Sequence, residues 1–373
     1  MNQCERLLAV LHYENYDRLP VLHFGFWGET MQKWAQEGHL TIEEVRSWGD
    51  GNLVDKAIGD RLGFDGNYYT TIGANSDIKP HFQPRVLEEL PDGSRKVLNG
   101  HGVVIIQKEG TAGIPPEVDH LLKDRQSWEK EFLPRLRFNA SRVNLSEQRL
   151  AEICRADRQY PLGLHCGSLY GRIRDWTGMV NLAYIHIDDP KLFAEMIEVN
   201  ADLSYQCTEA MLDIPGAHYD FGHFWEDICF KSGPLINPAV FRSQVGPGYR
   251  RITDLLRRHD IDLVSLDCDG KIDALVPIWL ENGVNVMFPI EVGTWHASIL
   301  PWREQYGPQI RGVGGMDKKV FAYNYTAIDA EIERLRPLVD LGGFIPCPDH
   351  RLAPDAKWEN VQYYCERMRK VFG

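Results

Sequence analysis

Apolar and polar positions along the chain follow two alternating periods, which predict strands and helices in turn. Eight short apolar runs, most of them bounded by glycine, proline or aspartate, have the length and composition of buried strands. They span residues 19–26, 63–70, 161–167, 217–223, 262–268, 284–290, 310–316 and 343–348. Segments with a helical period lie between nearly all of them. This alternation predicts an α/β fold, a single (β/α)8 TIM barrel over residues 1–373.

The predicted helices add detail to this reading. They cover about residues 2–12, 30–37, 41–60, 119–136, 146–155, 171–184, 190–213, 237–259, 271–282, 296–306, 326–340 and 355–372. Asn237 and Pro238 open one of them with a good N-cap and a proline in the first turn. A doubly wound open sheet is the alternative fold. It is disfavoured because no GxGxxG motif opens a helix after the first strand.

One region, residues 72–118, breaks the rhythm. It contains a PDGSRK turn and the alternating run HGVVIIQKEG. These features predict an inserted β-hairpin after the second strand, with Asp92 and Gly93 at its turn. An insertion between a barrel strand and its helix lies on the active-site face. The hairpin is therefore either a lid over the pocket or a peripheral decoration, and the sequence leaves both open.

Composition narrows the class of partner. The formal net charge of −12 argues against a general binder of nucleic acid or anionic membranes. The sequence contains no run of about 18 apolar residues, so it predicts no membrane span. The N-terminus, MNQCERLLAVLHYEN, lacks the basic start and long apolar core of a signal peptide. Eight cysteines without a CxxC pair favour a reducing compartment, so we expect a cytoplasmic protein.

The strand DLVSLDCDG, residues 262–270, carries the most distinctive polar pattern. Ser265, Asp267 and Asp269 share one face because side chains alternate along a strand. In a parallel barrel, catalytic groups lie at the carboxyl ends of the strands. The two aspartates therefore predict a functional site. The alternative for Asp269 is a helix cap, since a helix is expected to open near Lys271.

Other reactive side chains follow the remaining predicted strands. Among all the side chains at strand ends, we predict Asp267, Asp269 and His350 as catalytic or metal-binding residues, because carboxylates and imidazoles perform acid–base chemistry or bind a metal. We expect a pocket for the substrate to be lined by His23, Trp27, His223, Glu226 and Glu291. The full set of candidates at strand ends is His23, Trp27, Glu29, Tyr68, Tyr69, His165, Cys166, His223, Glu226, Asp227, Asp267, Cys268, Asp269, Glu291, Asp317, Cys347, Asp349 and His350.

Five segments in this order resemble the uroporphyrinogen decarboxylase superfamily over nearly the whole chain. They are RLLAVLHYENYDRLPV, WEDICFKSGPLINPAVFRSQVGPGYRRI, DLVSLDCDGKIDALVPIWLENGVNVMFPIE, YGPQIRGVGGMDKKV and GGFIPCPDHRLAPD. The resemblance implies a (β/α)8 barrel that is often a homodimer. It also implies one of two activities: decarboxylation of uroporphyrinogen without a cofactor, or methyl transfer that depends on a corrinoid held by a partner protein.

Departures from the family pattern favour the second activity. The decarboxylases carry an arginine motif after the first strand for substrate carboxylates, whereas this chain has HFGFWGETMQKW, without arginine. Members that methylate thiols bind zinc through His-x-Cys and a later Cys. The first pair matches Asp267 and Asp269 here, and the later position falls near His350. A zinc ion bound by two carboxylate oxygens and one imidazole nitrogen remains an alternative, but a thiol as the methyl acceptor is disfavoured.

The resulting hypothesis is a methyltransferase that moves a methyl group from a small methoxy compound or methylamine to a corrinoid on a partner protein. The first alternative is a decarboxylase, for which Arg172, Arg174 or Arg351 would supply the cationic pocket. The second alternative is a binding protein that kept the barrel and lost the chemistry.

Overall fold

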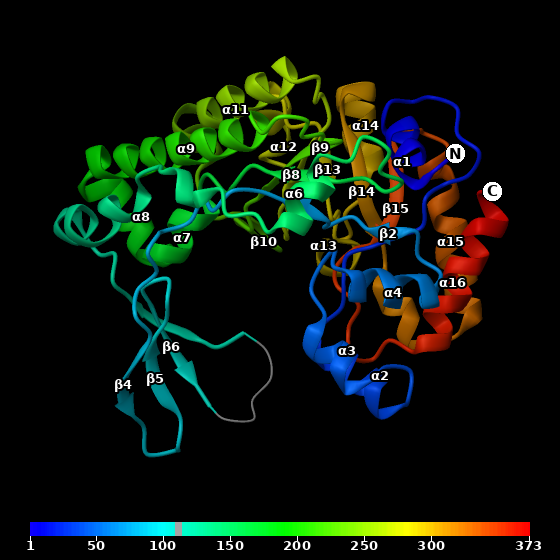
Figure 1. Ribbon diagram of the computed structural model, residues 1–373, viewed down its shortest axis with the longest axis horizontal. Coiled ribbons are helices and arrows are strands. Elements are labelled where there is room, and N and C mark those ends of the chain that lie inside the picture. Colours follow the sequence, from blue (N-terminus) through cyan, green and yellow to red (C-terminus); the bar gives the residue numbers. More distant parts are fainter. Residues whose placement is uncertain (109–113) are drawn as a thin grey trace.

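A parallel sheet forms the centre of the molecule in the computed structural model, which describes residues 1–108 and 114–373 (Figure 1). Seven strands pair in one sheet, and two more form a small parallel sheet. In pairing order the seven are β15 (Phe344–Pro348), β14 (Arg311–Met316), β13 (Val286–Phe288), β12 (Val264–Asp267), β9 (Phe221–Trp225), β8 (Gly163–His165) and β3 (Thr71–Ile72); the small sheet pairs β1 (Leu22–His23) with β2 (Gly66–Asn67).

Each of the eight predicted apolar runs contains or overlaps an observed strand, although the hydrogen-bonded part is shorter. Two observed strands correspond to the second run. The strand β2 lies within the run and pairs with β1, whereas β3 lies just beyond the run and pairs with β8. After β1, Phe26 forms a parallel bridge with Leu352, which follows β15. The strands thus follow the order of a barrel, but in the described residues no continuous ladder closes it.

Helices pack on the outside of the sheet, because parallel strands such as β12 are buried on both faces. The α-helices are α1 (Gln3–Leu11), α2 (Gly28–Gln36), α3 (Ile42–Ser47), α4 (Leu53–Leu62), α5 (Arg125–Ser127), α6 (Glu147–Ile153), α7 (Gly171–Thr177), α8 (Met179–Asp188), α9 (Pro190–Leu212), α10 (Pro238–Val240), α11 (Gly246–Arg258), α12 (Val276–Glu281), α13 (Val292–Trp295), α14 (Ile299–Tyr306), α15 (Tyr325–Val339) and α16 (Trp358–Val371). Shorter turns of 3-10 or π type are η1 (Trp128–Phe132), η2 (Leu133–Leu136), η3 (Ala140–Arg142), η4 (Phe241–Val245), η5 (Gly307–Gln309) and η6 (Lys318–Ala322).

Five predicted helices differ clearly from the structure in their extent. The segment 119–136 contains α5, η1 and η2, and the segment 171–184 is divided at Gly178 into α7 and α8. The segment 41–60 forms two helices, α3 and α4, separated by a turn that contains Gly49 and Gly51. The segment 237–259 is divided into α10, η4 and α11. The helix predicted over 271–282 begins only at Val276, with Pro277 in its first turn, where proline is favoured because it lacks a backbone donor.

The insertion is larger than the predicted hairpin. It is a four-stranded antiparallel sheet of β4 (Arg85–Glu89), β5 (Arg95–Leu98), β6 (Val103–Gln107) and β7 (Glu117–His120), which projects from the main body in Figure 1. The turn at Asp92 and Gly93 joins β4 to β5, and Gly93 has a φ of 80°. Further along, β10 (Cys229–Phe230) and β11 (Gly233–Pro234) form a small hairpin. Residues 109–113 of the predicted insertion lie outside the described residues.

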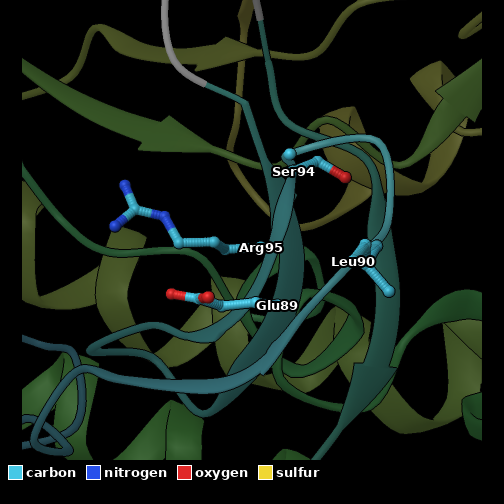
Figure 2. A pocket seen from close by; sticks show the side chains of 5 residues that line it. Glu89, Leu90, Ser94 and Arg95 are labelled. Atoms are coloured by element: carbon cyan, nitrogen blue, oxygen red, sulfur yellow. The ribbon is translucent and has the colours of Figure 1, made fainter.

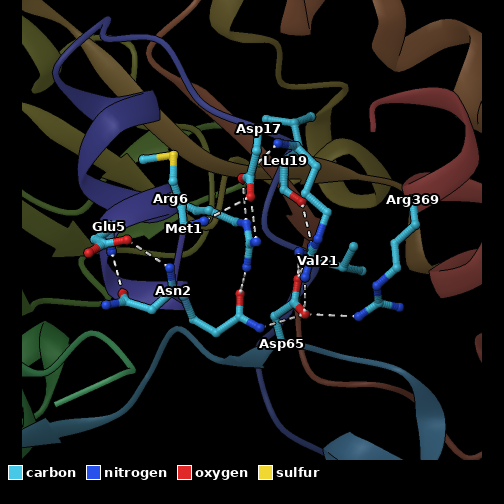
Figure 3. Close-up of polar contacts among 11 residues, drawn as sticks. Met1, Asn2, Glu5, Arg6, Asp17, Leu19, Val21, Asp65 and Arg369 are labelled. Carbon is cyan, nitrogen blue, oxygen red and sulfur yellow. Dashed lines mark hydrogen bonds and ion pairs between the residues drawn. The ribbon is translucent and has the colours of Figure 1, made fainter.

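One buried carboxylate joins the two ends of the chain to the sheet (Figure 3). Asp65 accepts hydrogen bonds from the Arg18 and Arg369 guanidinium groups and from the backbone N–H of Val21. Burial opposes its ionisation, but these bonds outweigh burial and lower the pKa of Asp65. None of the helices in the described residues has the length and apolarity needed to cross a membrane.

Candidate functional site

A pocket of about 150 Å³ opens where several parallel strands end. Its lining residues follow or end β1, β2, β9, β12 and β15, which converge because parallel strands share one direction. They are Phe24, Trp27, Tyr69, Trp225, Asp227, Asp267, Asp269, His350 and Arg351. All three predicted catalytic residues and one predicted binding residue, Trp27, therefore lie together at this mouth.

Three carboxyl groups share this small space. Asp267 is only 4% exposed, and burial raises its pKa well above the usual range. The neighbouring charges of Asp269 and Asp227 raise it further, against a hydrogen bond from Tyr69. Burial also raises the pKa of Asp227, although the Arg174 guanidinium opposes this. Asp267 thus keeps its proton to a higher pH than an ordinary aspartate and can act as a proton donor.

The imidazole of His350 is fixed beside the carboxyls. Its Nε2 lies 3.3 Å from an Asp269 carboxylate oxygen, and its Nδ1 accepts a hydrogen bond of 2.8 Å from the backbone N–H of Arg351. Trp27 stacks on the ring, with 5.5 Å between centroids and 12° between planes. Because Nδ1 accepts, Nε2 carries the hydrogen of the neutral ring and points it toward Asp269.

The arginines near the pocket are already engaged by carboxylates. Arg351 forms a bidentate pair with Asp50, at 3.1 and 2.6 Å. Arg174 lies 2.5 Å from Asp175 and 3.7 Å from Asp227. The third arginine, Arg172, lies 3.5 Å from Asp77 and from Asp175 and packs over the Trp225 ring. Each guanidinium proposed for a carboxylated substrate thus has its charge compensated within the protein.

The predicted metal set does not have the geometry of a metal site. Asp267, Asp269 and His350 converge, but no group of three or more His, Cys, Asp or Glu side chains in the described residues could hold an ion. The contact between His350 and Asp269 is instead a direct ring-to-carboxylate contact. The zinc that the superfamily resemblance left open therefore stays a prediction.

His23 lies outside the pocket, contrary to its predicted role. The ring is 1% exposed and packs against Phe26 and Phe64, at centroid distances of 5.0 and 4.8 Å. Its Nδ1 accepts a hydrogen bond from the backbone N–H of Gly25. The reason is strand alternation, because the neighbouring Phe24 lines the pocket and His23 must therefore face away from it.

His223 lies behind the pocket wall. It is fully buried, and its ring makes an edge contact with Tyr69 at 5.2 Å. Burial lowers the pKa of His223 to about 3, and the nearby ring of His165 adds to the effect. Neither ring nitrogen has a hydrogen-bond partner among the described residues. The residue thus contacts a lining side chain without lining the pocket itself.

Glu226 holds a helix end rather than a substrate. It is fully buried and accepts hydrogen bonds from the backbone N–H groups of Leu169, Tyr170 and Gly171, at 2.6, 3.0 and 2.7 Å. The Tyr249 hydroxyl also donates to it. These donors surround the N-terminus of α7, where a negative charge is favoured. The predicted role in the donor pocket is therefore replaced by a structural one.

Glu291 supports the loop that carries Asp269. Its carboxylate accepts hydrogen bonds from the Gly270 backbone N–H at 2.6 Å and from the Thr294 hydroxyl at 2.9 Å. Burial raises its pKa, and the charge of Asp269 contributes. Glu291 does not line the pocket, so it can influence the site through its neighbours Asp269 and His350.

Aromatic lining residues were harder to predict than carboxylates. Tyr69 and Asp227 lie at strand ends and belonged to the wider candidate set, but Phe24 and Trp225 had no distinguishing signal, because aromatic residues beside strands are equally typical of a core.

A second hollow, of about 250 Å³, lies at the β4–β5 turn and is lined by Glu89, Leu90, Gly93, Ser94 and Arg95 (Figure 2). It is distant in sequence from every residue of the mouth pocket.

Comparison with known proteins gives a likeness of fold. No protein-family model and no curated protein sequence matches the chain. Among solved structures, a methyltransferase from Methanosarcina mazei is similar over 99% of this chain and 98% of its own, with a TM-score of 0.60 and 15% identity. A B12-independent methionine synthase from a Shewanella species matches over 95% and 98%, with a TM-score of 0.48 and 12% identity. At these identities the first match shows a shared fold.

Proposed function

We propose that this chain is an enzyme that transfers a methyl group from a small donor to a corrinoid carried by a partner protein. The observation that carries the proposal is the convergence of Asp227, Asp267 and Asp269 with His350 in one pocket at the strand ends. The likeness to a structure described as a methyltransferase supports it, since methyl transfer is then a reaction this fold accommodates.

The chemistry asked of the pocket concerns the donor's leaving heteroatom. A reduced corrinoid, when bound, supplies the nucleophile that takes the methyl carbon. The heteroatom keeps the bonding electron pair, so a leaving oxygen needs a proton and a positively charged nitrogen becomes neutral. Asp267 can donate that proton because burial and its neighbours raise its pKa. Asp269 and His350 can hold the heteroatom or replace the proton.

Decarboxylation of a carboxylated substrate is less well supported. Such a substrate needs free cations, and the three arginines named for it are engaged by Asp50, Asp77, Asp175 and Asp227. A substrate carboxylate would also face the three pocket carboxyls, and like charges at short range repel. The methyl donor, either a methoxy compound or a methylamine, does not bring this conflict.

The experiment is a spectroscopic assay with reduced cobalamin. Under anaerobic conditions the protein is mixed with Co(I) cobalamin and with pools of methoxylated aromatics, methylamines or methyl thioethers. We expect loss of the Co(I) absorption that depends on both protein and donor. With a methoxy donor, whose leaving oxygen needs a proton, Asp267→Asn should slow the reaction about 100-fold or more, the usual contribution of a positioned acid or base.

A matched control lies at the other end of the same strand. Asp262 precedes β12 and its side chain is 62% exposed, so Asp262→Asn should leave the rate unchanged. No donor-dependent loss with any pool, repeated with a cognate corrinoid protein, would reject the proposal for these donors.

A further inference from the structure

Aromatic rings form the apolar part of the pocket lining. Phe24 and Trp27 follow β1, Tyr69 follows β2, and Trp225 ends β9. The faces of such rings are negative and attract cations, tryptophan most strongly. Proteins recognise quaternary ammonium groups by surrounding them with several rings. Four rings from three separate chain segments line this space. Protein cations already lie over three of them, Arg351 over Phe24 and Tyr69 and Arg172 over Trp225, so these rings attract cations in this protein.

The charges in the same pocket have the sign that favours a cation. Asp227, Asp267 and Asp269 face it, and the only guanidinium among its lining residues, that of Arg351, is paired with Asp50. His350 can offset one carboxylate at most. Burial is the main cause of the raised pKa of Asp267 and of Asp227, and the neighbouring carboxylates raise both further. A bound cation would relieve this repulsion, whereas a neutral ligand would not.

The size of the pocket fits a small head group. Its volume is about 150 Å³. An apolar cavity of about 150 Å³ accepts benzene. A trimethylammonium group is smaller than benzene, so the pocket can hold such a head group. Volume alone does not separate it from a small methoxy donor, and the choice between them rests on the rings and the charges.

We propose that this pocket selects a quaternary methylammonium compound as the methyl donor, with Phe24, Trp27, Tyr69 and Trp225 as an aromatic cage. This inference rests on the proposed function, whose methyl donor it specifies. In the transfer step the C–N bond breaks and nitrogen keeps its electron pair, leaving as a neutral tertiary amine. The methyl carbon bonds to the reduced corrinoid, which supplies the new pair, and no proton is required.

The first test measures binding without turnover. The probes are choline and its neutral isostere 3,3-dimethylbutan-1-ol, in which carbon replaces nitrogen, titrated calorimetrically into the full chain. We expect choline to bind at least about tenfold more tightly, because only choline gains the ring and carboxylate attraction. Equal affinity for the two probes, or no binding of choline, would overturn the proposal.

Matched variants locate the binding site. Trp27→Leu and Asp227→Asn should each weaken choline about tenfold and leave the isostere unaffected. Trp295, a half-buried tryptophan outside the pocket, provides the control, and Trp295→Leu should leave choline affinity unchanged. Unchanged choline affinity in both pocket variants would refute the cage.

A third readout needs no variant. A cation in the pocket should lower the raised pKa of Asp267 and Asp227, so choline binding should release protons in the pH range where these carboxyls titrate. Titrations in two buffers of different ionisation enthalpy measure that release, and proton uptake would contradict the proposal.

The outcomes also separate this inference from the proposed function. If choline binds but is not consumed with Co(I) cobalamin or with a cognate corrinoid protein, the cage proposal is supported and methyl transfer from choline is rejected. If Co(I) is consumed with a methoxy donor but choline does not bind, the proposed methyltransferase function is supported and the cage proposal is rejected.

Discussion

Two histidines near the pocket, half-buried His165 and fully buried His223, should make folding sensitive to mild acid. His165 and His223 lie on neighbouring strands, with ring centroids 6.4 Å apart. Burial lowers the pKa of His165 to about 4 and that of His223 to about 3, from an ordinary value of 6.5. Since the unfolded chain binds these protons first, stability is full above pH 6.5 and falls as the pH is lowered.

The magnitude is set almost entirely by the unfolded chain. Both folded pKa values lie below 5, so each ring stays neutral in the folded protein at pH 5. Such a histidine is protonated in this pH range only in the unfolded chain, where its pKa is 6.5. It therefore lowers the unfolding free energy of the protein by about 2 kcal/mol between pH 7 and pH 5. His223→Leu should therefore reduce the pH dependence by about 2 kcal/mol.

The assay is urea denaturation followed by tryptophan fluorescence at pH 7 and pH 5, for the native chain and His223→Leu. Comparing the two proteins cancels the carboxyl groups that titrate in both. The control is His259→Leu, the same substitution at an exposed position, which should not change the pH dependence. A native-like pH dependence in His223→Leu would show that this ring is charged or paired in the folded protein, and would refute the reasoning.

Two further substitutions test the framework of the site. Glu226→Ala leaves three buried backbone N–H groups without their acceptor, so the unfolding free energy should fall by about 3 kcal/mol or more, while exposed Glu14→Ala should have little effect; an equally small change in both would contradict the capping role. At Gly314, φ is 126° and an added Cβ would lie 1.5 Å from the Pro289 carbonyl oxygen. Gly314→Ala should thus cost more than about 3 kcal/mol, against about 1 kcal/mol for Gly216→Ala, where φ is also positive but nothing lies within 4 Å; equal melting temperatures would show that the backbone relaxes.

The order of elements follows from local pattern, and this is why it was predictable. A buried parallel strand such as β12 needs an apolar run on both faces, and a helix beside it needs a 3.6-residue period. The ends of elements were less accurate. The predicted hairpin proved to be a four-stranded sheet because β6 pairs with both β5 and β7, and the turn at Asp92 and Gly93 gives no signal for those two pairings.

The sequence by itself determined that Asp267, Asp269 and His350 follow strands whose carboxyl ends meet, and so lie at one mouth. Only the tertiary structure decided which neighbouring side chains also face that mouth. His23 and Phe24 differ by one position, and strand alternation turns Phe24 alone into the pocket. Likewise, Arg351 meets Asp50 across 301 residues, so its charge is compensated by a contact that no local pattern encodes. Residue types and order set the available chemistry, but the direction and pairing of each group depend on contacts between distant segments.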